Sequence, residues 1–169
     1  MVTENMWAGG DDIAARCAEI FRANGLGSPR SMDELVSLVS AISGKPVIIE
    51  PLGDERWEKL TALWVSYPDS DIVLVRSTDT ELYRTHCILH ELSHIICRHP
   101  GCSDLASAEV VQTLITSGCT VRGRVLRPRD ARVTSEHTAT IEGEAENLAR
   151  LIGRSLLRPR YAADEKSFG

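Results

Sequence analysis

The sequence lacks an apolar run of transmembrane length, is poor in aromatic residues and carries no excess of basic charge. Its 169 residues are 5% aromatic, with a formal net charge of −5. A helix needs roughly 20 apolar residues to cross a bilayer, so no membrane-spanning segment is expected. The negative charge offers no general footprint for nucleic acid, and direct nucleic-acid binding is not expected. The first seven residues have no basic n-region, and we expect no signal peptide.

Cysteine is present, but not in the spacings of a disulfide framework or a cysteine zinc site. The five cysteines are an odd number and contain no C-x-x-C pair. This usage is typical of reduced thiols in the cytoplasm, where we expect the protein to reside. Cys87 and Cys97 are expected to be small core residues.

The composition predicts one soluble domain. Hydrophobic residues make up 43% and charged residues 25% of the chain, and its length suffices for a real core. We therefore expect one domain over residues 1–169, with loose tails at 1–10 and 160–169.

Hydrophobic periodicity and capping signals predict an α+β fold, in which a small, mostly antiparallel sheet packs beside a helical core. Of its strands, 71–75 is expected to lie at an edge, where it could align an extended substrate. The predicted helices cover about residues 11–23, 31–42, 79–99, 104–117 and 135–157, and the predicted strands cover 46–50, 61–66 and 71–76.

The most informative motif is His90-Glu91-Leu92-Ser93-His94, which has the form H-E-x-x-H. Four residues is just over one helical turn, so the two imidazoles face the same way and can bind one ion. Glu91 lies beside them as a general base for a metal-activated water. Zinc in such a site needs a third protein ligand and leaves the fourth position to water.

The third ligand is predicted on the helix over 135–157. Its apolar stripe places Glu142 close to the buried face and Glu146 one turn later on the same side. Glu142 is therefore the predicted third ligand, and Glu146 is predicted to accept a hydrogen bond from the free N–H of a ligating imidazole. Glu144 falls on the opposite flank and is expected to be solvated.

Two further features have simpler interpretations. His99 does not fit the metzincin spacing, since Cys97 replaces the required glycine, and it is expected to lie at a helix end near the last carbonyls.

An arginine-rich stretch is predicted to be an irregular, solvated loop, with contact to an acidic substrate surface or to DNA as the less favoured alternative. Its arginines are Arg122, Arg124, Arg127, Arg129 and Arg132.

The H-E-x-x-H motif and the later glutamate-containing motif together resemble the ImmA/IrrE family of zinc metallopeptidases. The matching segments are His90-Glu91-x-x-His94 and Glu142-x-x-Ala145-Glu146-x-x-Ala149, with Glu146 where the family has Asp or Asn. The resemblance covers roughly residues 30 to 160.

The resemblance implies a zinc-dependent endopeptidase, with manganese as the other candidate ion. Its implied substrate is a helix-turn-helix transcriptional repressor on a separate chain, cut by limited proteolysis during a stress response. The alternative is a non-catalytic metal-binding module that docks to an antitoxin-like regulator. Glu91 favours the peptidase, because a structural metal site needs no general base and is closed by a fourth protein ligand.

Overall fold

The computed structural model describes residues 8–52, 60–100, 120–125 and 136–158. Residues 8–10, expected in a loose tail, form the first turn of a helix instead. The helix predicted over 104–117, the tail after 160 and Arg127, Arg129 and Arg132 lie outside the described residues.

The predicted helices that the structure describes are present with similar bounds. They are α1 (Ala8–Ala23), α2 (Met32–Ser43), α3 (Glu81–Ile96) and α5 (Glu136–Leu156). Their ends follow capping chemistry: the Ser31 hydroxyl accepts a hydrogen bond from the Glu34 backbone N–H at the start of α2. Gly44 ends the same helix with φ of 83°, a left-handed conformation that glycine adopts without strain. Within the described residues, no helix combines the length and apolar character that crossing a membrane requires.

The strands form one mixed sheet in the order β1-β3-β2-β4. Strands β1 and β3 pair in parallel, while β2 pairs antiparallel with β3 and with β4, so the sheet is mostly antiparallel and the α+β prediction is confirmed. The bounds are β1 (Val47–Leu52), β2 (Leu60–Ser66), β3 (Asp71–Arg76) and β4 (Thr120–Val125). The prediction of an irregular loop is wrong for residues 120–125, because hydrogen bonding to β2 makes them a strand.

Strand β3 was expected at the edge of the sheet, and this prediction is wrong. It lies between β1 and β2, and the ends of the described order are β1 and β4. The run Ile72-Val73-Leu74-Val75 is apolar at every position, which is typical of a strand covered by neighbours rather than of an edge. Substrate pairing with β3 is therefore excluded by its two neighbouring strands.

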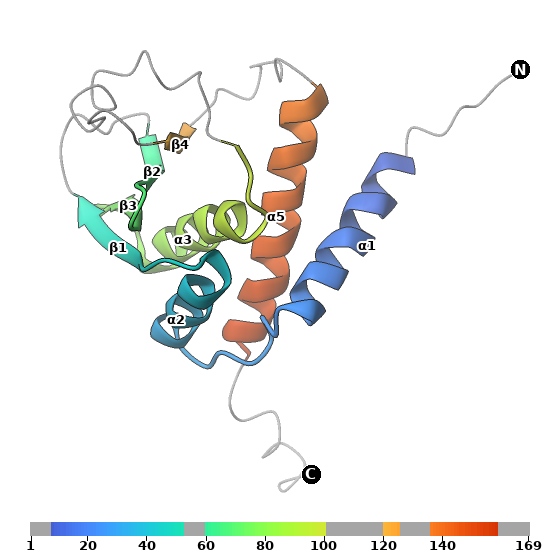
Figure 1. The fold of residues 1–169 in the computed structure, drawn as a ribbon, viewed down its shortest axis with the longest axis horizontal. Coiled ribbons are helices and arrows are strands. Elements are labelled where there is room, and N and C mark those ends of the chain that lie inside the picture. The colour runs from blue at the N-terminus through green and yellow to red at the C-terminus, as the bar shows by residue number, and fades with distance from the viewer. Residues whose placement is uncertain (1–7, 53–59, 101–119, 126–135, 159–169) are drawn as a thin grey trace, which may run out of the picture.

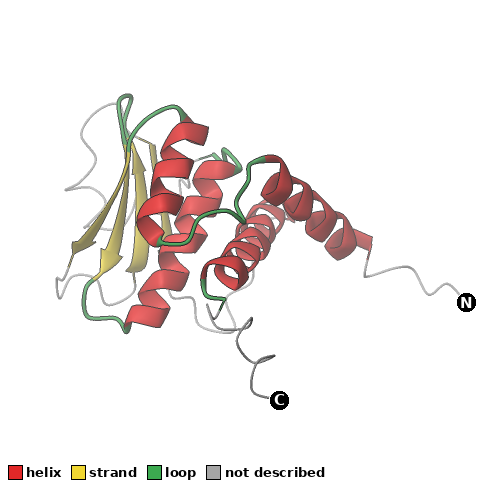
Figure 2. Ribbon diagram, turned by 90° about the horizontal axis from the view of Figure 1, so that it is seen from below, coloured by secondary structure: helices red, strands yellow, loops and turns green. Residues whose placement is uncertain are grey.

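Helix α3 lies between the sheet and α5. The helices lie on one side of the sheet in Figure 2, and α3 contacts both the sheet and α5. In Figure 1, α5 runs beside α3, and α1 covers α5 from its other side. Every residue from Cys87 to Ile96 is buried as a result, including the whole H-E-x-x-H motif. The fold thus holds the motif in the interior, where its polar groups need partners from other elements.

Candidate metal centre

Helix α3 presents His90 and His94 from one face. The Thr80 hydroxyl caps the helix by accepting a hydrogen bond from the Tyr83 backbone N–H, which starts the helical register ten residues before His90. The two Nε2 atoms lie 3.0 Å apart. Both side chains are almost completely enclosed, with exposed fractions of 3% and 1%. Burial and the helix backbone therefore fix both imidazoles in place.

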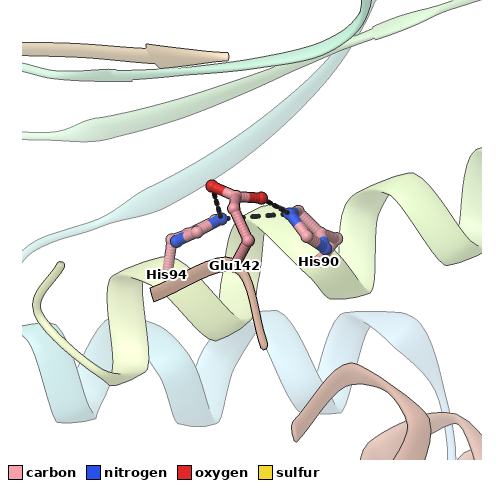
Figure 3. Close-up of side chains that lie close together, drawn as sticks. All are labelled: His90, His94 and Glu142. Atoms are coloured by element: carbon pink, nitrogen blue, oxygen red, sulfur yellow. Dashed lines mark hydrogen bonds and ion pairs between the residues drawn. The ribbon is translucent and has the colours of Figure 1, made fainter. Parts of the chain in front are cut away.

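Glu142 reaches the same point from α5, 52 residues after His90. One carboxylate oxygen, Oε2, lies 3.2 Å from the His90 Nε2, and the other, Oε1, lies 3.7 Å from the His94 Nε2. Figure 3 shows this carboxylate directed at both ring nitrogens. The Glu142 side chain is 45% exposed, in contrast to the two buried histidines.

The three side chains fit one metal ion. Nitrogen and oxygen ligands about 2.0–2.1 Å from a tetrahedral zinc lie about 3.3 Å from each other. The separations of 3.0, 3.2 and 3.7 Å bracket that value. Two imidazole nitrogens and a carboxylate converging on one point also need a positive charge or protons between them. These residues could therefore hold a metal ion, as the close grouping of their donor atoms indicates.

Comparison with protein-family models, curated proteins and solved structures finds no match. The resemblance to the ImmA/IrrE family thus stays a prediction from the two motifs.

Two other predicted site residues lie on the same helices as this cluster. Glu91 directly follows His90 in the sequence of α3 and is 1% exposed. The Glu146 Oε2 lies 3.5 Å from the His90 Nδ1 and 3.6 Å from the His86 Nε2. Its Oε1 pairs with Arg150 at 3.2 Å. Glu146 is therefore on the side of His90 that faces away from Glu142, where an acceptor for the ring N–H is needed.

Glu144 is not solvated, so that prediction is wrong. It is 4% exposed and its Oε1 pairs with the Arg16 Nη1 at 2.9 Å. The apolar stripe of α5 packs against α3, but α1 covers the neighbouring flank that carries Glu144. Helical periodicity within residues 135–157 contains no information about that second covering helix.

His99 lies just after the end of α3, as expected, and the residue is 8% exposed. Arg98 has φ of 54°, and this left-handed residue folds the chain back after α3. The His99 N–H then donates to the His94 carbonyl at 3.0 Å. Its side chain meets His94 and Glu144, a contact that the spacing of five residues alone did not suggest.

Proposed function

We propose that the chain is a metal-dependent endopeptidase of the H-E-x-x-H type, acting on a separate protein substrate in the cytoplasm. Zinc is the proposed ion, with manganese as the alternative. The observation that supports this most is the convergence of His90, His94 and Glu142, with Glu91 next to His90 in the sequence and a Glu142 side chain that is 45% exposed.

The reaction would be peptide hydrolysis. A bound divalent cation would polarise the scissile carbonyl and make water more acidic. Glu91 accepts the proton of the attacking water as its oxygen bonds to the carbonyl carbon. Glu91 then donates that proton to the amine nitrogen as the C–N bond breaks, so it is unchanged at the end. His90, His94 and Glu142 would hold the ion, and Glu146 would orient His90.

We further propose a helix-turn-helix transcriptional repressor as the substrate. This choice rests on the resemblance of the two motifs to the ImmA/IrrE family. Limited proteolysis would remove the repressor from DNA during a stress response. No nucleic-acid contact by this chain is needed for that outcome.

Two matched pairs of variants test the proposal. Glu142→Ala should lose the metal that the purified wild type carries at about one ion per chain, whereas Glu19→Ala, an exposed carboxylate on α1, should retain it. Elemental analysis after purification without a chelator or a metal-affinity tag measures both.

Glu91→Gln should keep the metal and the fold but lose cleavage, since a neutral amide cannot accept the water's proton. Glu81→Gln, an exposed position on the same helix, is its control. The assay incubates each variant with the helix-turn-helix repressors of its own cell and follows fragments by mass spectrometry. Equal cleavage by wild type and Glu91→Gln would exclude this mechanism. Metal binding without cleavage by any variant would instead favour the docking module.

A further inference from the structure

A second row of polar side chains lies behind His94, on the side opposite its Nε2. The Nδ1 atoms of His94 and His99 are 2.8 Å apart. The His99 Nε2 lies 2.9 Å from the Glu144 Oε2, and the Arg16 Nη1 lies 2.9 Å from the Glu144 Oε1. His94, His99 and Glu144 are all buried, and they come from α3, the turn after it and α5. The row therefore links three parts of the fold to one candidate metal ligand.

When the rings of His94 and His99 are both neutral, the hydrogen bonds of this row permit only one placement of their ring protons. A carboxylate only accepts hydrogen bonds, so the His99 Nε2 carries the proton that it donates to Glu144. The Nδ1 of a neutral His99 is then an acceptor, and the His94 Nδ1 must carry the donated proton. The His94 Nε2 is left with its lone pair, which faces Glu142 and His90.

We propose that His99 and Glu144 are positioning residues that hold His94 in the tautomer whose Nε2 can bind a metal. The proposal rests on the metal site of the proposed function, but the His94 tautomer that it predicts can be measured in the metal-free protein. Histidine ligands commonly need such a partner, because the hydrogen bond on one nitrogen decides which nitrogen is available to the ion. Arg16 holds Glu144 in place through the contact between its Nη1 and the Glu144 Oε1.

A second metal ion at Cys97, His99 and Glu144 is the competing explanation of the same residues, whose donor atoms lie within 4.8 Å of one another. Three observations favour the positioning role. Both His99 nitrogens already have partners, and the Arg16 guanidinium repels a cation from Glu144. Burial, together with Cys17 and Glu144, also raises the pKa of the Cys97 thiol to about 12, which disfavours the thiolate that a metal requires.

The deciding experiment is nitrogen-15 NMR of the histidine rings in the metal-free protein, which identifies the protonated nitrogen of His94. We expect Nδ1–H in the wild type and in His99→Gln, because the Gln side chain can both accept from His94 and donate to Glu144. His99→Phe keeps an aromatic ring but neither nitrogen, and His94 should then lose its fixed Nδ1–H tautomer. A wild type with His94 protonated at Nε2 would overturn the proposal.

Zinc affinity, measured by competition with a chelator, supplies the second readout. His99→Phe should bind zinc roughly 10- to 100-fold more weakly, and His99→Gln should recover most of that loss. Glu144→Gln, which keeps an acceptor for His99, should lose less than His99→Phe and provides a second variant if His99→Phe does not fold. Equal zinc affinity in the wild type, His99→Phe and Glu144→Gln would overturn the positioning role while leaving the proposed function intact.

Cys97→Ala separates the competing site from the positioning role. It should leave both the His94 tautomer and the zinc content unchanged. Two zinc ions per wild-type chain, with one lost in Cys97→Ala, would overturn the proposal in favour of a second metal site. The expected tautomer in a wild type that binds neither zinc nor manganese would support the positioning of His94 and refute the proposed function, so the two failures are distinguishable.

Discussion

Cys97 illustrates how strongly the interior beside the candidate metal centre controls the chemistry of a single side chain. Burial is the main cause that raises its pKa from the ordinary 9.0 to about 12, with smaller contributions from Cys17 and Glu144. The Cys17 thiol, which donates to the Glu144 carbonyl at 3.4 Å, has its pKa raised by the same two kinds of cause, burial first. Both thiols are free and stay protonated at neutral pH.

The raised pKa of Cys97 predicts a loss of stability in alkali. An unfolded chain releases the thiol proton near pH 9, whereas the folded protein keeps it up to about pH 12. The contribution to the free energy of unfolding is therefore complete below pH 9 and falls as the pH rises toward 12. Urea unfolding of wild type and Cys97→Ala between pH 8 and 10.5 should give a steeper fall for the wild type.

Cys17 remains in both proteins and cancels in that comparison. Parallel stability curves would show that Cys97 titrates in the folded protein as it does in the unfolded chain. Slow alkylation of Cys97 at pH 8 in the folded protein, followed by mass spectrometry, provides an independent check, since only the thiolate reacts.

At the scale of elements, the start of α2 offers a test of how much a capping residue stabilises the fold. The Ser31 hydroxyl accepts from the Glu34 N–H at 3.2 Å, and the Glu34 carboxylate accepts from the Arg30 N–H at 2.7 Å. Ser31→Ala removes the cap and should lower the free energy of unfolding by about 1 kcal/mol. Ser37→Ala is the control, because this exposed serine is inside the helix and its hydroxyl donates to the Asp33 carbonyl.

Alanine favours a helix interior, so Ser37→Ala should be neutral or slightly stabilising. Equal denaturation midpoints for the two variants would mean that the Ser31 cap adds nothing to the free energy of unfolding. Zinc affinity should be the same in both, since α2 contributes no residue to the candidate metal centre.

The helices could be predicted from the sequence because their signals are local. The Ser31 cap bonds within three residues along the chain, and Gly44 ends the same helix by its own backbone conformation. The grouping of Glu142 with the two histidines was also foreseeable, since an acidic side chain beside an apolar stripe needs a cation. The signals behind these predictions lie within single helices, although the grouping itself joins α3 and α5.

The order of the strands and the role of Glu144 depend on several elements together. Asp71 opens β3 with a charge, yet it is 1% exposed because the Trp64 Nε1 donates to it at 2.8 Å and Lys45 pairs with it at 3.1 Å. Arg16 on α1 likewise accounts for the burial of Glu144 on α5. Such partners lie on other helices and strands, so no periodic pattern within one element identifies them.

At the scale of the whole molecule, the candidate metal centre joins two helices that are distant in sequence. His90 and His94 come from α3 and Glu142 comes from α5, and these helices pack together between the sheet and α1. An ion bound to all three would hold α3 and α5 together, which an unfolded chain cannot reproduce. Metal binding should therefore appear as stability of the entire fold.

Zinc should accordingly raise the melting temperature of the metal-free protein. At a free concentration 100 times the dissociation constant the gain is about 2.7 kcal/mol, which corresponds to roughly 5–10 °C for a chain of this size. EDTA should reverse the shift in the wild type and in Glu19→Ala, and Glu142→Ala should show little of it, because two imidazoles from α3 alone do not connect the helices. An equal shift in Glu142→Ala would mean that zinc binds elsewhere in the chain. The linkage of the two helices by one ion, and with it the three-residue metal centre, would then be wrong.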